Sequence, residues 1–345
     1  MANLNPAKSD KIKVINAEGS YYEIGHTIGR KTRLQIQQIL HSKSYDENQS
    51  VIDNEYNDFL KYIEPYPFIV DELRGMADGS GTDFESIVRL NIVELDRERN
   101  IQFDCSSFII KKDNTDILAH SEDGLEGDDI FLLRATYPSG TEILSFCYYG
   151  SLVGISASLN SHGFIMSCNL VLSNDNQPGE PKRVFSRRLV ECKTIDEALD
   201  IVKTARRCQG QHYIFKQFDR TVGVEASATR VQSREIAHNY YHCNNYIFPE
   251  MKKYEADAGY VKKLNIRTLE AEGNYQSLSD LKGVKEVLSS HKNHPNCFCT
   301  HGSEKGNYSK TLGSIYFDCI KKQIWIGYGP TCRIELECIP FSHPW

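Results

Sequence analysis

Little in this 345-residue chain points to a membrane or to a nucleic acid. No run of about eighteen apolar residues occurs, and a helix needs such a run to cross a bilayer, so a membrane span is not expected. Residues 1–13 are polar and carry lysines, and they lack the apolar stretch of a signal peptide. The formal net charge is −6, and no block of lysine and arginine reverses it locally, so phosphate backbones and anionic lipids are not expected partners.

Cysteine is not scarce, but its arrangement does not suggest disulfide bonds. The 11 cysteines are odd in number and show no spacing typical of a disulfide framework. Because a secretion signal is also missing, we expect most of them to be reduced thiols in a cytoplasmic protein. A free cysteine usually packs as a small apolar side chain, so burial is the first interpretation of each one.

The pattern of apolar and turn-forming residues predicts a protein without internal repeats. Ser20 with Glu23, and Thr82 with Glu85, have the spacing of capping boxes at the starts of helices. The predicted helices cover residues 20–39, 50–63, 68–76, 82–92, 184–207, 264–270 and 278–290. The predicted strands cover residues 105–110, 116–119, 130–137, 142–149, 153–159, 163–168, 213–217, 221–225, 231–237, 311–317, 323–328 and 332–339. Asp113 with Asn114 predicts the turn between the first two of these strands. This order of helices, strands and helices again predicts a layered α+β domain.

Several short stretches occur in an order that points to one family. The first is Glu-Leu-Arg-Gly-Met-Ala-Asp-Gly-Ser-Gly at residues 72–81, which Asn91 follows. The second is Cys105, which opens Cys-Ser-Ser-Phe, with Asp123 eighteen residues later at the end of His-Ser-Glu-Asp. Further motif residues follow along the chain: Asn160 with Gly163, Asn169, Arg187 with Arg188, Leu189 and Ala198, His212 with Tyr213, Glu225, and His242 with Asn244.

These stretches resemble the acyl-coenzyme A:isopenicillin N acyltransferase family of N-terminal nucleophile hydrolases, over residues 20–335. That family includes the insect N-β-alanyldopamine hydrolases, or Tan proteins, and the His-Ser-Glu-Asp stretch that ends at Asp123 is closest to this Tan-like branch. Asp104 precedes Cys105, where the best-known members have glycine. The resemblance implies a four-layer αββα sandwich, with a helical pro-segment of residues 1–104 packed outside a catalytic part of residues 105–345.

The resemblance also implies a mechanism centred on Cys105. A free cysteine thiol has a pKa of about 8.5 and needs a base to become a good nucleophile. Cleavage of the bond between Asp104 and Cys105 would give Cys105 an α-amino group with a pKa of about 8, and that amine could take the thiol proton. The same sulfur would make the cut by attacking the carbonyl of Asp104, and the two resulting chains would stay folded together.

Three further residues complete the site that the resemblance implies. Asp123 would orient the new α-amine. Asn244 would donate to the oxyanion of the tetrahedral intermediate, and Asn169 is a weaker candidate for the same pocket. The substrate acyl group would be held on Cys105 as a thioester.

Structural interpretations of these residues remain open. Cys105 could be a buried strand cysteine, Asp123 a turn aspartate before Gly124, and Asn244 a turn residue beside Asn245. The other polar residues of the motifs are interpreted as structural or as having no role: His120, His242 and Glu122.

The sequence therefore supports three hypotheses of function. The first is an amidohydrolase that cleaves a small N-acylated amine or amino acid through a thioester on Cys105, without a cofactor. The second is an N-acyltransferase on the same fold, with a coenzyme A thioester as co-substrate. The third is a non-catalytic or zinc-stabilised binding protein.

Metal and phosphate sites are not expected. Five residues near position 296 have side chains that bind zinc in other proteins: His291, His294, Cys297, Cys299 and His301. Their spacing matches no zinc module, and Pro295 interrupts them. The positions of Cys299 and Cys243 in the chain do not support a hydrolase in which either one works with a distant histidine. The glycine-rich residues 78–81 lack the lysine and the preceding strand of a P-loop, so they are interpreted as a helix end.

Overall fold

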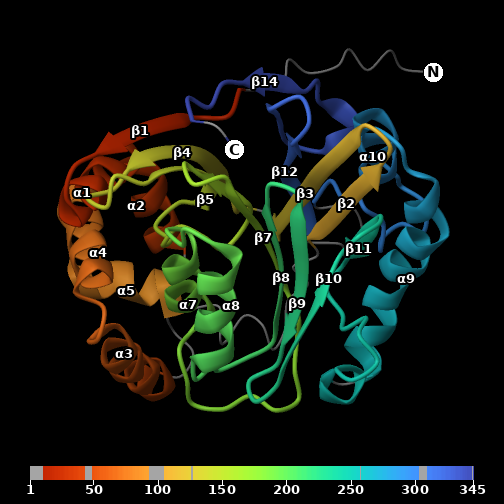
Figure 1. The fold of residues 1–345 in the computed structure, drawn as a ribbon. Helices are drawn as coiled ribbons and strands as arrows, with labels where there is room; N and C mark the ends of the chain where they lie inside the picture. Colours follow the sequence, from red (N-terminus) through yellow and green to blue (C-terminus); the bar gives the residue numbers. More distant parts are fainter. Residues whose placement is uncertain are drawn as a thin grey trace, which may run out of the picture.

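The computed structural model describes residues 11–42, 49–92, 105–125, 127–256, 258–302, 309–343 and 345. Two β-sheets face each other in the middle of the molecule, and helices cover the outer face of each sheet (Figure 1). This arrangement confirms the predicted α+β class and the four-layer αββα sandwich. The predicted junction at Asp104 belongs to residues 93–104, which lie outside the described residues.

The larger sheet has eight strands in the order β1-β4-β5-β6-β7-β8-β9-β10. Its strands are β1 (Val14–Glu18), β4 (Ile130–Thr136), β5 (Glu142–Tyr148), β6 (Ser158–Asn160), β7 (Phe164–Leu170), β8 (Gln211–Gln217), β9 (Arg220–Ala226) and β10 (Val231–Glu235). Neighbouring strands are antiparallel, except that β1 lies parallel to β4. The strand β1 is absent from the predicted elements, although its buried Ile15 and Ala17 alternate with exposed residues as in a half-buried strand.

The smaller sheet has six antiparallel strands in the order β11-β2-β3-β12-β13-β14. They are β11 (Tyr240–His242), β2 (Ser106–Lys112), β3 (Thr115–Leu125), β12 (Ser309–Asp318), β13 (Gln323–Tyr328) and β14 (Glu337–Ile339). The strands β2 and β3 form a hairpin through the predicted turn at Asp113 and Asn114, and this hairpin carries Cys105 at its open end.

Helices from both ends of the chain cover the two sheets. Those beside the larger sheet are α1 (Tyr21–Lys31), α2 (Arg33–Ser42), α3 (Gln49–Ile63), α4 (Pro67–Ser80), α5 (Phe84–Ile92), α7 (Lys182–Leu189) and α8 (Ile195–Thr204). Those beside the smaller sheet are α9 (Ala258–Asn274) and α10 (Leu281–Leu288) (Figure 1). The capping box at Ser20 is confirmed. The one at Thr82 is wrong, because the carboxylate of Asp83 instead accepts the backbone N–H of Ser86 at 2.6 Å.

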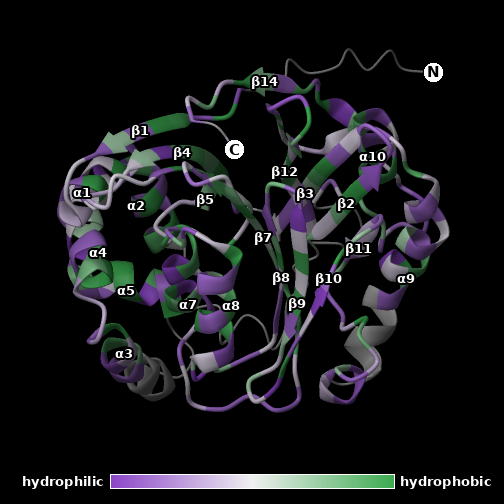
Figure 2. Ribbon diagram, viewed as in Figure 1, coloured by the Kyte–Doolittle hydropathy of each residue, from purple (hydrophilic) through white to green (hydrophobic). Residues whose placement is uncertain are grey.

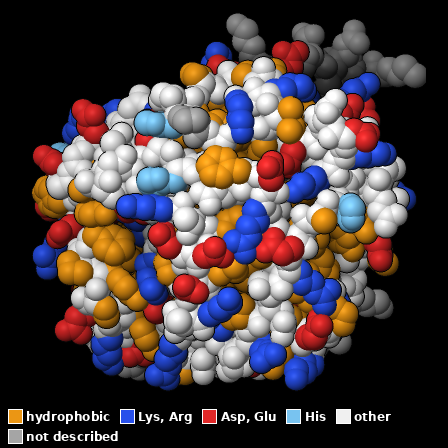
Figure 3. Space-filling view, in the orientation of Figure 1, with side chains coloured by type: hydrophobic (Ala, Val, Ile, Leu, Met, Phe, Trp, Pro, Cys, Tyr) orange, Lys and Arg blue, Asp and Glu red, His pale blue; other side chains and the backbone are white. Residues whose placement is uncertain are grey.

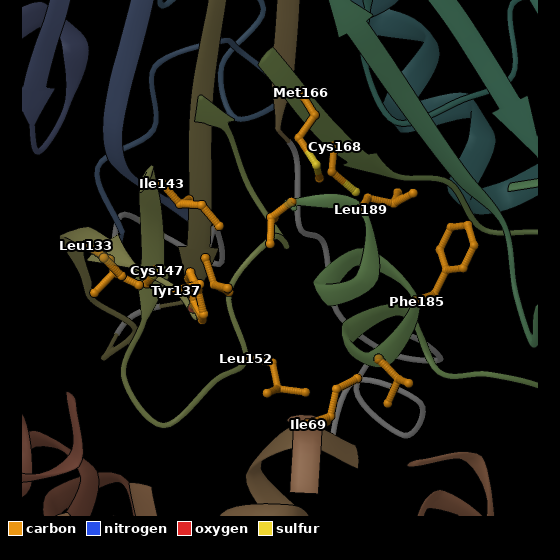
Figure 4. Packing of buried hydrophobic residues seen from close by; sticks show 14 of the residues in the cluster. Ile69, Leu133, Tyr137, Ile143, Cys147, Leu152, Met166, Cys168, Phe185 and Leu189 are labelled. Carbon is orange, nitrogen blue, oxygen red and sulfur yellow. The ribbon is translucent and has the colours of Figure 1, made fainter. Parts of the chain in front are cut away.

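Three apolar cores hold the four layers together. One lies between the larger sheet and its helices, where Ile69, Leu133 and Phe185 are buried (Figure 4). A second lies between the sheets, and a third lies between the smaller sheet and the helices α9 and α10. Hydrophobic residues accordingly recur along β2, β4 and β5 (Figure 2).

The molecular surface carries charges of both signs. On the face seen in Figure 3, basic and acidic side chains are interspersed. In the described part of the chain, no helix combines the length and the apolar character that a bilayer crossing needs. All 11 cysteines belong to the described residues, and each is a free thiol.

The N-terminal motif at residues 72–81 packs α4 closely against α1. A Cβ atom on Gly75 would lie 2.0 Å from the carbonyl oxygen of Tyr22, and one on Gly79 would lie 2.2 Å from that of His26. On α1, Gly25 and Gly29 meet α4 in the same way. The glycines of this motif therefore allow two helix backbones to approach closely.

A buried ion pair joins the N-terminal segment to the rest of the molecule. The Nε atom of Arg187 on α7 donates to the Oε2 atom of Glu72 on α4 at 2.8 Å, and both side chains are fully buried. Asn91 adds a second connection, because it donates to the carbonyl of Gly150 and accepts from the backbone N–H of Leu152. Three motif residues therefore have structural roles in the interface between residues 11–92 and residues 105–345.

Candidate active site

Hairpin register places four polar side chains on one face of the smaller sheet. Ser107 pairs with His120 across β2 and β3, so Cys105, which immediately precedes β2, lies opposite Glu122. Side chains alternate between the two faces of a strand, so all four point the same way as Ile109, which belongs to the core between the sheets. Cys105 is 5% exposed. The candidate nucleophile is thus held between the two sheets, at the end of β2.

A chain of hydrogen bonds runs from Cys105 across to the larger sheet. The Sγ atom of Cys105 donates to Oε1 of Glu122 at 3.2 Å. The other carboxylate oxygen of Glu122 lies 2.8 Å from Nε2 of His120, whose Nδ1 lies 2.9 Å from the hydroxyl of Ser107. That hydroxyl donates to Oδ1 of Asn169 on β7 at 2.8 Å. The site therefore uses side chains from both sheets.

Electrostatics keep the thiol protonated and its partner ionised. Burial raises the pKa of Cys105 well above its ordinary value, and the negative charges of Glu122 and Asp123 raise it further. Burial alone would also raise the pKa of Glu122, but the hydrogen bond and charge of His120 outweigh it and lower that pKa. The hydroxyl of Tyr148 on β5 donates to the same carboxylate at 2.7 Å. Glu122 is therefore a fixed acceptor for the thiol proton.

Asp123 lies on the other face of β3. Its Oδ2 atom is 2.8 Å from Nη2 of Arg267 on α9, and both side chains are buried. The guanidinium of Arg267 lies over the ring of Phe298, with its Cζ atom 5.9 Å from the ring centroid. The backbone carbonyl of Asp123 accepts from Tyr148 at 3.2 Å. Asp123 thus follows Glu122, the hydrogen-bond partner of Cys105, and Arg267 holds the carboxylate of Asp123 in place.

The two predicted asparagines lie side by side at the end of β7. Asn244 follows β11, and its Nδ2 atom donates to the carbonyl of Leu170, the residue after Asn169. The Nδ2 atom of Asn169 is buried and has no hydrogen-bond partner among the described residues. An unpaired buried donor is uncommon, so this amide nitrogen is free to donate to a further group.

Other motif residues support the backbone around this site. Asn160 bonds the backbones of Val190 and Cys192 through its amide nitrogen. The carboxylate of Glu225 accepts the backbone N–H groups of Ile247 and Phe248. The rings of His212 and His242 stack with their centroids 3.4 Å apart, and burial lowers the pKa of each.

The structure links Cys105 and Asn169 through one hydrogen-bond network, and three residues without a predicted role belong to this network or contact Asp123. Those three are Glu122, Tyr148 and Arg267. The sequence does contain a pointer to Glu122, because a two-residue turn at Asp113 and Asn114 sets a register in which residue 105 faces residue 122. Nothing comparable points to Tyr148 or Arg267, since their positions depend on how the sheets and α9 pack.

The family model described as acyl-coenzyme A:6-aminopenicillanic acid acyl-transferase matches residues 110–331. The chain belongs to this acyl-transferase family. Membership confirms the resemblance drawn from the motifs and the expectation of an enzyme. The matched region begins at Ile110, so Cys105 lies just before it.

Two proteins similar to this member of the acyl-transferase family are a hydrolase from a fly and one from a bacterium. Over 223 residues, the chain is 28% identical to the β-alanyl-dopamine/carcinine hydrolase of Drosophila melanogaster. That match covers 56% of this chain and 58% of the relative, so the chain spans just over half the length of the relative. The crystal structure of the C2A mutant of conjugated bile acid hydrolase from Clostridium perfringens is 10% identical with a TM-score of 0.41, and the match covers 69% of this chain and 97% of that one.

Proposed function

We propose that this chain is an amidohydrolase that activates itself by cleavage before Cys105 and then cleaves a small N-acylated amine through a thioester on that residue. The observation that carries the proposal is the buried thiol of Cys105, which donates to an ionised carboxylate 3.2 Å away at the end of a strand. A nucleophile with an acceptor in hydrogen-bond reach is the arrangement that covalent catalysis requires.

Self-cleavage needs a base before any free α-amine exists, and Glu122 can supply it. Its carboxylate takes the thiol proton as the sulfur attacks the carbonyl carbon of Asp104. The bond from that carbon to the nitrogen of Cys105 then breaks, the nitrogen takes the proton, and a thioester forms. Water hydrolyses the thioester and releases the carboxyl group of residue 104 and the thiol.

Turnover would then use the new α-amine of Cys105 as the base, since its pKa of about 8 suits a reaction near neutral pH. The sulfur attacks the substrate amide, the amine product leaves with a proton, and water hydrolyses the acyl thioester. The amide nitrogens of Asn169 and Asn244 would donate to the oxyanion, a role supported for Asn169 by its unpaired Nδ2 atom. Asp123, fixed by Arg267, would help to orient the α-amine.

The substrate class is proposed from the relative. The fly protein is named as a hydrolase of β-alanyl-dopamine and carcinine, which are amides of β-alanine. We therefore expect a small acyl group with an amine of similar size. The name of the family favours acyl transfer as a second candidate, in which an acyl-coenzyme A thioester loads the sulfur.

Intact mass under denaturing conditions tests the self-cleavage. The wild-type chain should give two fragments that divide before Cys105, and Cys105→Ala should remain one chain. A folded wild-type protein that stays one chain would refute the mechanism.

Substrate assays then test the reaction. Purified protein is incubated with β-alanyl-dopamine or carcinine, with and without acyl-coenzyme A, and the release of β-alanine, the release of coenzyme A and the formation of an N-acylated product are measured. Release of β-alanine without the thioester supports hydrolysis, whereas an N-acylated product that forms together with free coenzyme A, and only when the thioester is added, would instead support acyl transfer.

A further inference from the structure

Four metal-binding side chains converge at a point that the proposed mechanism does not use. His291, Cys299, His301 and Cys332 each offer one ligand atom, and these four atoms all lie within 4.8 Å of one another. Cys299 is buried and His301 is half-buried, whereas His291 and Cys332 are exposed. The cluster therefore sits at the edge of the protein, where an ion could enter from solvent.

Contacts within the cluster converge on a single nitrogen. The Nε2 atom of His301 lies 2.9 Å from Nε2 of His291, 3.3 Å from Sγ of Cys332 and 3.8 Å from Sγ of Cys299. An imidazole nitrogen either donates one hydrogen bond or accepts one, so it cannot satisfy three such neighbours. Hydrogen bonding therefore does not explain why these four atoms meet.

A shared cation does explain it. Zinc binds imidazole nitrogen at about 2.0–2.1 Å and thiolate sulfur at about 2.3 Å, so ligand atoms around a tetrahedral zinc ion are about 3.3 to 3.8 Å apart. The three distances to His301 are close to this range before any adjustment. A set of two sulfur and two nitrogen donors is typical of zinc.

The fold itself brings the donors together. The backbone N–H of Cys299 donates to the carbonyl of Ser290 at 3.1 Å, which places Cys299 beside His291. His301 pairs with Lys310, just inside β12, through an isolated β-bridge. Cys332 belongs to the 3₁₀ turn Thr331–Arg333, which follows β13. The ligands thus come from two segments that backbone bonds already hold in place.

We infer that His291, Cys299, His301 and Cys332 bind one zinc ion in a closed structural site. Both thiols lose their protons to solvent on binding, so the two thiolates balance the charge of the ion. Four protein ligands leave no open position for water or substrate, which separates this site from catalytic zinc. The inference replaces the expectation of no metal, and it does not depend on cleavage at Cys105.

Zinc here would support Asp123 from the outer face of the smaller sheet. Phe298 lies between the ligands His291 and Cys299 in the chain, and its ring packs against Phe108 on β2 with centroids 5.9 Å apart. The guanidinium of Arg267, which holds Asp123, also lies over this ring. A zinc ion that ties this segment to the turn after β13 would therefore stabilise the position of Arg267.

Metal content of the full chain tests this inference. Protein is produced with added zinc, passed through a sizing column and measured by inductively coupled plasma mass spectrometry. We expect about one zinc per chain for the wild type, and at least a tenfold loss for Cys299→Ser, Cys332→Ser and His291→Asn. His294→Asn and Cys297→Ser are matched controls, because both residues are close in sequence but absent from the cluster. Both should keep the metal.

Cobalt gives a second readout that does not require a variant to fold. Zinc is removed with a chelator from the wild-type chain, and cobalt(II) is added. The visible spectrum should show the strong bands of a tetrahedral ion with thiolate ligands. Three outcomes would each overturn the inference. The first is less than about a tenth of a zinc per chain together with no such bands, and the second is equal zinc loss in the two controls. The third is a Cys299–Cys332 disulfide found by mass spectrometry.

Discussion

Cys105 is a protonated thiol that donates a hydrogen bond to Glu122 in this structure. The group that activates it must therefore accept this proton. Its thiol is buried beside a carboxylate, so forming a thiolate there would place two negative charges together. Proton transfer to Glu122 during the attack avoids this. We therefore expect the carboxylate to matter most in self-cleavage, before the α-amine is free.

Glu122→Gln tests that role. The amide cannot take the thiol proton, so self-cleavage should slow by a factor of about 100 or more. The rate is followed by intact mass after cell-free synthesis of the chain. Glu142→Gln is the control, because this carboxylate on β5 contacts His343 at 3.0 Å and is not part of the Cys105 network. Cleavage of Glu122→Gln at the wild-type rate would rule out Glu122 as the base.

The two pKa shifts also predict a pH dependence for self-cleavage. The pKa of Glu122 is lowered from its ordinary 4.5, so the carboxylate stays ionised above that value and loses its function only as the pH falls further. The pKa of Cys105 is raised well above 9.0, so the thiol keeps its proton up to alkaline pH. Self-cleavage should therefore change little between about pH 5 and 9.

Substrate hydrolysis should behave differently, because it would depend on the α-amine. The rate should rise as that group loses its proton, through a pKa of about 8. Initial rates of both reactions across this range distinguish the two bases. Parallel profiles would show that one group serves both steps.

At the residue scale, the sequence indicates the position of Glu122 but not that of Arg267. The turn at Asp113 and Asn114 was predicted, and its hairpin register places Glu122 opposite Cys105. Arg267 could not be found in this way, since it reaches Asp123 only because α9 packs on the smaller sheet.

At the scale of elements, the contact of α1 with α4 is set by small residues. The two backbones are so close that no side chain fits between them at Gly25, Gly29, Gly75 or Gly79. The motif at residues 72–81 is part of the resemblance to the family, and in the structure it forms this helix packing. Its predicted function as a helix end also holds, because Gly81 ends α4 in the left-handed conformation with φ 68°.

Gly75→Ala should therefore destabilise the protein by about 1–3 kcal/mol, because the helices must separate to admit the methyl group. Gly273→Ala on α9 is the matched control, since a Cβ atom there meets nothing within 4 Å, and alanine should stabilise that helix slightly. Thermal unfolding in the Cys105→Ala background, where only one chain unfolds, measures both. Equal changes in stability for the two variants would show that α1 and α4 can separate enough to admit a methyl group at no cost.

At the scale of the whole molecule, the sequence does not predict which distant strands pair with each other. The sequence predicts most of the strands one by one, although not β1 or β11, and the division of the strands between two sheets depends on partners far apart in the chain, such as β3 and β12. The edge strand β1 is not among the predicted elements. It is a short strand before a helix, and only its pairing with the distant strand β4 stabilises it. Cys332 joins the proposed zinc site from 31 residues beyond His301, so local spacing could not reveal it.

The same long-range contacts should keep the two chains together after cleavage. Residues 11–92 supply β1 to the larger sheet, bury α1, α4 and α5 on it, and pair Glu72 with Arg187. Arg187 is enclosed by Tyr21, Phe68 and Tyr137, with its Cζ atom 4.6 to 5.6 Å from their ring centroids. Separation of the chains would expose this apolar interface and leave two charges without their partners.

Arg187→Leu should weaken that association by about 3–5 kcal/mol, because it leaves Glu72 buried without its partner cation. The cleaved wild type should elute from a sizing column as one species, and the variant should separate into two at a lower guanidinium concentration. Arg220→Leu removes an exposed pair with Asp196 and Glu235 and should cost at most about 1 kcal/mol. If both variants separate at the same concentration, the buried pair does not hold the chains together, and the apolar contacts of β1 and α4 must account for the association.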